Sequence, residues 1–253
     1  MNPQEPFDSY AEVYEERFNR NPLGRYQRER VHAEITPYLR PGARLLDAGC
    51  GPGSDFDFYQ SRGLKIDALD SSPRMVELAR EKAAGLKLEA RIFHVALEFY
   101  RPDTLYDLIL LNFGVINVFA NLPEILQKVN AMLAPGGVLA LVSMPPFHFF
   151  TLLGWAGQLR LRTAARRLFL KKGILASGFR FFYYRKRDFR EHFRLLKKIN
   201  LCPLLPNPEQ FRNYAWARSA SKLLLPLDRR IAAGAPDWLG GDHVCYILAK
   251  SGS

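Results

Sequence analysis

Apolar and polar residues alternate with two different periods between residues 43 and 144. Five short apolar runs have the length and composition of buried strands, at residues 43–50, 65–70, 88–97, 106–117 and 138–144. Segments with apolar residues at helical spacing separate them, at residues 54–63, 72–85 and 122–137. Strands that alternate with helices in this way predict a parallel sheet with right-handed crossover connections.

Cap and turn residues mark the ends of these segments. Ser72 is a suitable N-cap for the helix at 72–85, Pro73 suits its first turn, and Gly85 is expected to end it. The run at 106–117 is continuously apolar, which is typical of a strand that is covered on both faces. Such strands belong to sheets with helices on both sides.

The pattern changes outside this region. Residues 7–39 have apolar side chains at helical spacing, whereas residues 147–190 are rich in aromatic residues and arginine and do not alternate as strand and helix. Two further apolar runs, at 193–202 and 243–250, predict two more strands, and five prolines lie between them. Seven strands are therefore expected in all.

Charge is concentrated in one part of the chain. The net charge is +11, and residues 156–198 contain fourteen Lys or Arg and only two acids. The remainder of the chain is close to neutral. This segment is either a solvated helix face or a docking surface for an anion, such as a substrate carboxylate or phosphate, a membrane surface or RNA.

Three features bear on the compartment. The three cysteines have no spacing that suggests a zinc site or a disulfide framework, so we expect no metal and a reducing cytoplasm. The polar, acidic N-terminal sequence does not resemble a signal peptide. The apolar stretch 138–155 is interrupted by Pro145 and Pro146, whereas a membrane-spanning helix needs about 20 apolar residues in a row. We interpret it as a strand that ends at a corner.

The sequence "LLDAGCGPGSD", residues 45–55, contains three glycines directly after the first predicted strand. Ligands of open parallel sheets bind at the carboxyl ends of the strands, where glycines let the main chain come close. The dinucleotide fingerprint requires its third glycine at position 54, which is occupied by Ser54. The loop therefore departs from that fingerprint by one position.

Acidic residues beside the loop separate two classes of ligand. Asp47 and Asp55 flank the glycines, and two carboxylates there would repel a pyrophosphate. S-adenosylmethionine instead carries a sulfonium and an ammonium, so this charge pattern favours it. Asp70, at the end of the second strand, suits the ribose hydroxyls of either ligand, and its alternative role is to cap the following loop.

Four segments together resemble a known family. "LLDAGCGPGSD", "LDSSPRM", "YDLILLNFGVIN" and "MLAPGGVLALVS" have the order and spacing seen in the class I S-adenosylmethionine-dependent methyltransferases. The resemblance covers residues 40–145. "NFGVIN" followed by "ARR" is similar to the UbiE or type-11-like enzymes that methylate small molecules.

The resemblance implies a fold and a division of the chain. The expected fold is α/β and Rossmann-like, a doubly wound, mostly parallel seven-stranded sheet with an antiparallel terminal strand and a helical, aromatic lid insert. The implied divisions are an N-terminal helical lid at 1–40, a cofactor-binding core at 41–146, an acceptor-binding insert at 147–190, and a segment completing the sheet at 191–253.

The resemblance also implies which residues bind S-adenosylmethionine and release S-adenosylhomocysteine. The implied cofactor-binding residues are Tyr14 and Arg30 of the lid, Asp47, Ala48, Gly49, Cys50 and Gly51 of the loop, Asp70 and Ser71 at the ribose, Met75, Ala96 and Leu97 at the adenine, and Asn112 and Phe113 at the methionine end. The third strand lacks the aspartate with which many relatives bind the adenine amino group. Main-chain groups of Ala96 and Leu97 are expected to replace it.

The aromatic and basic insert suggests the methyl acceptor. His148 and Tyr183 are the candidate bases, with His192 a further one, whereas His243 lies far from the loop in sequence. Candidate acceptor-binding residues are Asn117, His148, Arg166, Arg167, Tyr183 and Tyr184. We expect methyl transfer to oxygen, nitrogen or carbon of a hydrophobic, anionic small molecule or lipid, with contact at a membrane surface. The alternatives are an RNA methyltransferase that uses segment 156–198, with nucleic acid the less favoured partner, and a non-catalytic cofactor-binding partner protein.

Overall fold

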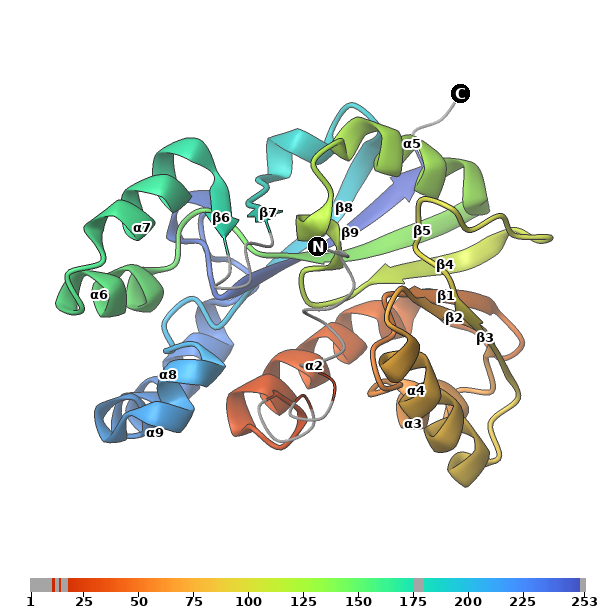
Figure 1. The fold of residues 1–253 in the computed structure, drawn as a ribbon, viewed down its shortest axis with the longest axis horizontal. Helices are drawn as coiled ribbons and strands as arrows, with labels where there is room; N and C mark the ends of the chain where they lie inside the picture. The colour runs from red at the N-terminus through yellow and green to blue at the C-terminus, as the bar shows by residue number, and fades with distance from the viewer. Residues whose placement is uncertain (1–10, 12–13, 15–17, 175–179, 251–253) are drawn as a thin grey trace.

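A seven-stranded sheet forms the centre of the protein in the computed structural model, which describes residues 11, 14, 18–174 and 180–250 (Figure 1). The strand order is β3-β2-β1-β4-β5-β9-β8. The strands are β1 (Arg44–Ala48), β2 (Lys65–Asp70), β3 (Ala90–His94), β4 (Tyr106–Leu111), β5 (Leu133–Ser143), β8 (Phe193–Leu201) and β9 (His243–Lys250). Strand β9 is antiparallel to both of its neighbours and the other pairings are parallel, which confirms the predicted fold class.

The strand order reverses beside β1, which pairs with β2 on one side and with β4 on the other. The connections that leave these strands therefore diverge, and a crevice opens at the carboxyl edge of the sheet, where ligands of such folds bind. The glycine loop follows β1 at this edge.

Helices cover both faces of the sheet (Figure 1). On one face, α5 (Leu122–Met132) packs through Leu126 and Val129 against strand residues such as Leu46. On the other face lie α2 (Pro22–Ile35), α3 (Phe56–Gln60) and α4 (Pro73–Leu86), with Leu45 among their contacts. Alternate residues of β1 enter opposite cores, as the geometry of a strand requires.

The predicted caps of α4 are partly confirmed. The Ser72 hydroxyl accepts a hydrogen bond from the Met75 N–H at 3.1 Å, and Pro73 is the first helical residue. The predicted end at Gly85 is wrong by one residue, because the helix continues to Leu86. Lys87 takes the left-handed C-cap conformation with φ of 52°.

Beyond β5 the chain builds a lobe beside the sheet (Figure 1). Its elements are α6 (Phe149–Gly157), α7 (Leu161–Ala165), a π-helical turn (Arg166–Leu170), the antiparallel pair β6 (Lys172–Ile174) and β7 (Arg180–Phe182), α8 (Pro208–Asn213) and α9 (Ala215–Ile231). Short 3₁₀ turns are Thr36–Tyr38, Val115–Val118, Lys186–Phe189 and Asp237–Leu239. The predicted lid and insert are described only in part, and the division of the chain into four segments stays a prediction.

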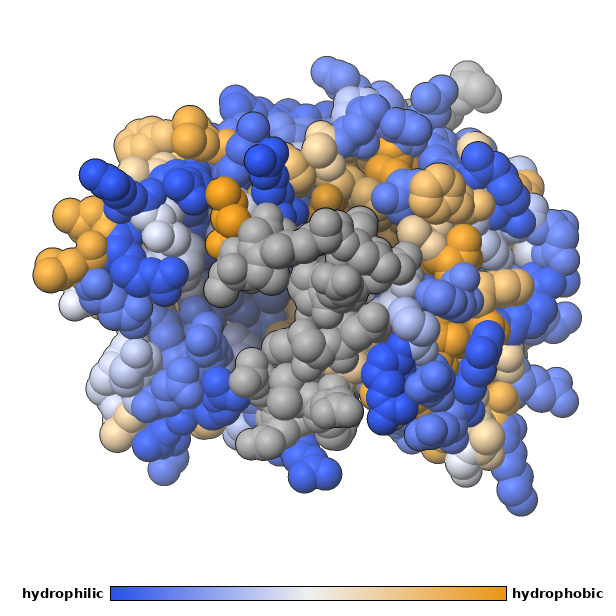
Figure 2. Space-filling view, viewed as in Figure 1, coloured by the Kyte–Doolittle hydropathy of each residue, from blue (hydrophilic) through white to orange (hydrophobic). Residues whose placement is uncertain are grey.

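The lobe has an unusual surface. Figure 2 shows hydrophobic residues at its outer edge beside strongly hydrophilic ones. The side chains of Leu159 and Phe169 are 86% and 80% exposed, with arginines close to them in sequence. In the part of the chain that the structure describes, none of the helices has the length and apolar character needed to cross a membrane.

Candidate functional site

The glycine loop leaves open space at one position. Gly49 and Gly51 have φ of 80° and 55°, in the left-handed region that favours glycine. A Cβ atom at Gly49 would lie 2.4 Å from Val115 Cγ2, so that glycine is required for packing. A Cβ atom at Gly51 would meet only Met75 Sδ, at 4.0 Å. A ligand can therefore approach the main chain above Gly51.

Asp70 joins the second strand to this loop. Its carboxylate accepts one hydrogen bond from the Gly51 N–H and another from the Ser72 N–H, both at 2.9 Å. These contacts fulfil the capping role considered for Asp70, and they also fix a partly exposed carboxylate beside Gly51. Its contact with a ribose stays a prediction.

The two acids that flank the glycines are not an exposed negative rim. Asp47 is 1% exposed and accepts a hydrogen bond from the Tyr59 hydroxyl at 3.0 Å. Burial, and then the nearby Asp55, raise the pKa of the Asp47 carboxyl well above its ordinary value. Asp47 is therefore a buried carboxyl and not part of an exposed charge that would repel a phosphate, which corrects the prediction.

Asp55 is paired with two side chains from α2. Its Oδ1 lies 2.6 Å from Arg28 Nη1 and 2.6 Å from His32 Nε2. Burial by itself would raise the pKa of the Asp55 carboxyl, but Arg28 and His32 outweigh it and bring the pKa below its usual range. Asp70 is thus the carboxylate near the loop that contributes an exposed charge, and the predicted rim of two acids is corrected.

Arg30, which was predicted to contact the cofactor from the N-terminal lid, lies away from the glycine loop. Arg30 Nη2 lies 3.8 Å from Glu34 Oε1, on another face of α2. Arg28 instead pairs with Asp55 and lies over the Phe113 ring, 4.9 Å from its centroid. Residues two apart on an α-helix point about 200° apart, so only one of these arginines can face the loop.

Aromatic side chains cover the end of β4. The Tyr14 ring stacks on Phe18 at 5.6 Å, and Phe18 meets Phe113 edge to face at 4.8 Å. Phe113 then meets the His243 ring at 5.6 Å and 89°. Tyr14 and Phe113, both predicted at the cofactor, therefore belong to one aromatic row.

The other predicted cofactor contacts lie around the same edge. The Asn112 amide donates to Asp55 Oδ2 at 3.1 Å, and its Oδ1 accepts from the Phe113 N–H, so Asn112 supports the loop. The remaining predicted residues follow β1, β2 and β3 or lie at their carboxyl ends, namely Ala48, Cys50, Ser71, Met75, Ala96 and Leu97. Met75 lies beside Gly51, whereas the Leu97 side chain is in the core under α5. Their contacts with the cofactor stay predictions.

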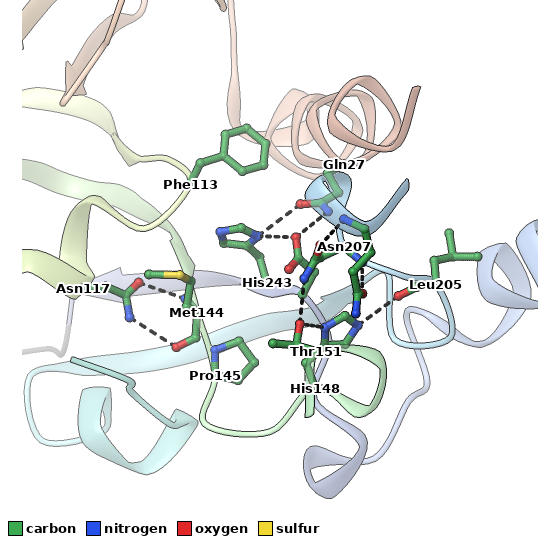
Figure 3. Close-up of polar contacts among 12 residues, drawn as sticks. Gln27, Phe113, Asn117, Met144, Pro145, His148, Thr151, Leu205, Asn207 and His243 are labelled. Carbon is green, nitrogen blue, oxygen red and sulfur yellow. Dashed lines mark hydrogen bonds and ion pairs between the residues drawn. The ribbon is translucent and has the colours of Figure 1, made fainter. Parts of the chain in front are cut away.

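His148, the first candidate base, is part of the interior (Figure 3). Its ring is 0% exposed, and its Nδ1 and Nε2 bond to Thr151 Oγ1 at 2.8 Å and to the Leu205 carbonyl at 3.0 Å. Burial is the main reason that its pKa falls to about 4. Both ring nitrogens are bonded to protein groups, so neither is free to take a proton from a methyl acceptor. We therefore withdraw His148 as a base and as a contact of the methyl acceptor.

The remaining acceptor candidates mostly support the main chain. Asn117 bonds to both main-chain groups of Met144 and to the Phe182 carbonyl (Figure 3). The Tyr184 hydroxyl donates to the Phe119 carbonyl. These contacts connect the lobe to the sheet, so neither side chain is left to select an acceptor.

Arg167 is a structural residue. It donates to the carbonyls of Pro146 at 2.9 Å and Pro145 at 2.8 Å, and it lies 4.5 Å from the centroid of the Tyr183 ring. Burial raises the pKa of the Tyr183 hydroxyl, which makes it a poor base at neutral pH. Arg166 is exposed to solvent. We therefore withdraw Arg167 as an acceptor contact and Tyr183 as a base, whereas the role of Arg166 stays a prediction.

Three residues close to the glycine loop or to the end of β4 were not predicted from sequence. Arg28 and His32 both contact Asp55 and are four residues apart, a spacing that places them on one face of α2. This helical spacing was a signal for Arg28. Gln27 and His243 contact each other although 216 positions separate them. The antiparallel direction of β9 offered a signal, because the first residue of such a strand lies at the carboxyl edge of its parallel neighbours.

Known proteins of similar sequence are methyltransferases. A family model described as a methyltransferase domain matches residues 17–201. The malonyl-[acyl-carrier protein] O-methyltransferase of Enterobacter lignolyticus is 36% identical over 103 residues, 40% of this chain and 39% of that protein. The demethylmenaquinone methyltransferase of Thermus thermophilus is 34% identical over 106 residues, 41% of this chain and 48% of that protein. The alignments thus span less than half the length of these two relatives.

Solved structures agree in fold. The 1,6-didemethyltoxoflavin-N1-methyltransferase of Burkholderia thailandensis has a TM-score of 0.62 at 14% identity, over 98% of this chain and 87% of that chain. The N-methyltransferase NodS of Bradyrhizobium japonicum, in complex with S-adenosylhomocysteine, has a TM-score of 0.59 at 12% identity and covers both chains fully. Since the family model matches well over half of the sequence, the chain belongs to the methyltransferase-domain family, and it shares the fold of these solved methyltransferases.

Proposed function

We propose that this protein transfers a methyl group from S-adenosylmethionine to a small, hydrophobic acceptor that carries an acidic group. When bound, S-adenosylmethionine supplies a reactive methyl group on a positively charged sulfur. The observation that supports its binding is a buried acceptor atom beside the glycine loop. Asp47 Oδ1 has no hydrogen-bond partner among the described residues, although a buried acceptor ordinarily has one. The ammonium group of the cofactor is a donor that suits it.

The chain's own residues have binding and aligning roles in this proposal. Gly51 lets the main chain approach the cofactor, and Asp70 accepts hydrogen bonds from its ribose. The row of Phe18 and Phe113 excludes water above the end of β4. Alignment of the two reactants and exclusion of water account for a large part of the acceleration in such reactions.

A basic and apolar cavity supports the acceptor class. It has a volume of about 500 Å³ and begins at Pro145 and Pro146, directly after β5. Its cationic lining residues are Arg185, Lys186, Arg187, Arg190 and Lys198, and its apolar lining includes Phe147, Leu168 and Trp238. None of its lining residues is acidic. This cavity, rather than Arg166 or Arg167, is the proposed place for the anionic end of the acceptor.

The relatives point in the same direction. Their names describe methyl transfer to a malonyl group on a carrier protein and to demethylmenaquinone, the first an acidic acceptor and the second an apolar one.

The lobe also has a surface that suits contact with a membrane. The exposed side chains of Leu161 and Leu170 lie among arginines and lysines in the sequence. Flotation with anionic vesicles and not with zwitterionic ones is the expected result for peripheral contact.

The test measures S-adenosylhomocysteine formation with matched pairs of hydrophobic acceptors, with and without a carboxylate or phosphate. Arg190→Ala is expected to raise KM for the anionic member by about tenfold, the effect of one charge-assisted contact, and to leave the neutral member unchanged. Arg212→Ala, an exposed arginine outside the cavity, is the control. Turnover on transfer RNA or ribosomal RNA with none on small molecules would replace the proposal by the RNA alternative. Cofactor binding without turnover on either would favour a non-catalytic partner.

A further inference from the structure

Three polar residues meet at the start of β9. Gln27 Nε2, from α2, donates to Asp242 Oδ2 at 2.9 Å. His243 Nδ1 lies 3.2 Å from the same carboxylate oxygen and 3.2 Å from Gln27 Oε1 (Figure 3). All three are largely buried, with exposed side-chain fractions of 14% for Asp242 and 9% for His243. Gln27 is 0% exposed.

These contacts determine the tautomer of the His243 ring. The Gln27 amide has to present its N–H to the Asp242 carboxylate, because a carboxylate only accepts. Its oxygen then faces His243 Nδ1, and both neighbours of Nδ1 are acceptors. Nδ1 therefore carries the proton, and in the neutral ring Nε2 has a free lone pair.

His243 Nε2 points towards the carboxyl ends of β4 and β5 (Figure 3). Among the described residues it has no hydrogen-bond partner. Figure 3 shows it on the side of the ring away from Gln27, towards Phe113 and Met144. These two residues follow β4 and β5, and the Phe113 ring contacts His243 directly.

We propose that His243 is the general base of the methyl transfer, with Asp242 and Gln27 as positioning residues. The inference rests on the proposed function. A base held in one tautomer by a carboxylate, with its second nitrogen free of partners among the described residues, has the geometry that proton removal requires.

The reaction balances in one step. The acceptor's N–H or O–H bond breaks and its proton moves to His243 Nε2. The acceptor's lone pair forms a bond to the methyl carbon, and the sulfur–methyl bond breaks with its electron pair remaining on sulfur. The imidazolium that results is stabilised by Asp242, and it returns the proton to water after release of the product.

This assignment narrows the acceptor class. A carboxylate is already deprotonated at neutral pH and needs no base, whereas a phenol, an enol or a protonated nitrogen does. The methylated atom is therefore an oxygen or nitrogen whose proton has to leave, and an acidic group on the acceptor binds without being methylated.

The first test needs no variant. Nitrogen-15 spectra of the uniformly labelled protein, assigned for His243, are expected to show the Nδ1-protonated tautomer above the pH at which the ring becomes neutral. The charged or titratable groups that act on this cluster are Asp242 beside the ring, His148 directly before α6, Arg167 from the π-helical turn, Tyr183 after β7 and Cys202 after β8. An Nε2-protonated neutral ring would overturn the inference.

The second test separates the base from the cofactor site. His243→Gln is expected to lower kcat by about 100-fold or more at pH 7 and to remove the acidic limb of the pH–rate profile, while the cofactor Kd by calorimetry stays within about threefold. Lys222→Gln is the control, because Lys222 is exposed on α9 and has no role in the proposed site.

Asp242→Asn tests the positioning role, and it is expected to shift the tautomer population as well as kcat. If His243→Gln binds cofactor and keeps kcat and the pH profile of the wild type, His243 is not the base and the proposed function stands. If the wild type neither binds S-adenosylmethionine nor forms product, the proposed function itself fails.

Discussion

The Asp70 carboxylate accepts a hydrogen bond from the Gly51 N–H at 2.9 Å, which connects the end of β2 to the glycine loop after β1. One oxygen of the carboxylate thus orients the loop while the other bonds to the Ser72 N–H. The group proposed to bind the ribose is therefore also a group that shapes the loop.

Asp70→Ala is expected to weaken S-adenosylmethionine binding by about 10- to 100-fold, because charge-assisted hydrogen bonds contribute about 1.5–3 kcal/mol. Asp70→Asn keeps an oxygen that accepts hydrogen bonds, so it should lose less affinity for S-adenosylmethionine than Asp70→Ala. Isothermal calorimetry measures both, with Glu77→Ala, an exposed carboxylate of α4, as the control. Equal affinity in the wild type and Asp70→Ala would contradict the ribose assignment.

Gly51→Ala tests the open space above the loop. The added methyl group meets no protein atom closer than 4.0 Å. The substitution therefore affects mainly the approach of the ligand and the backbone, whose φ of 55° is unfavourable for alanine. Cofactor affinity is expected to fall by about tenfold or more, equivalent to about 1.4 kcal/mol. Gly85→Ala is the matched control, since its Cβ also meets nothing and its helical conformation accepts alanine. A normal Kd for Gly51→Ala would show that the cofactor does not approach this residue.

Arg28→Met should destabilise the protein by about 3–5 kcal/mol, because Asp55 would remain buried without its main cation. Adding Asp55→Asn to the same chain is expected to recover part of this loss. Denaturant unfolding of both single variants and the double variant measures the coupling, and Arg25→Met on the exposed side of α2 is the control. Strictly additive effects would mean that the pair does not interact.

The free energy of unfolding is expected to depend on pH through His148, and the pKa of its ring determines the direction. Its pKa of about 4 in the folded protein is below its ordinary value of 6.5, so the unfolded chain binds more protons between these values. The folded protein has the full benefit of a neutral His148 above pH 6.5. As the pH falls towards 4, the free energy of unfolding decreases by at most about 3 kcal/mol because of this residue.

The difference in unfolding free energy between wild type and His148→Gln isolates this effect. Asp47 has a raised pKa and therefore acts in the opposite direction, losing stability as the pH rises. Because Asp47 is present in both proteins, its contribution cancels in the difference. A difference that is constant between pH 4 and pH 7 would exclude the buried, neutral imidazole.

Local patterns predicted most of the sheet but not the lobe. The apolar runs and the Ser72 cap depend on neighbours in sequence and lie close to the expected positions, but β5 begins at Leu133, inside the segment expected to be helical. Helix α9 was missed because prolines, including Pro226 within it, indicated a loop. Its helical conformation is supported by distant contacts, among them the hydrogen bond from the Tyr26 hydroxyl to Asp228 at 3.1 Å.

The sequence by itself determined the order of the elements, the glycine loop after β1 and the family, because these depend on spacing along the chain. The tertiary structure decided which charges remain exposed and which side chains meet. Asp55 looked like part of a negative rim until Arg28 was placed 2.6 Å from it, and His243 looked remote until β9 brought it to Phe113. Electrostatic energy depends on distance and burial in space, and neither can be read from separation in sequence.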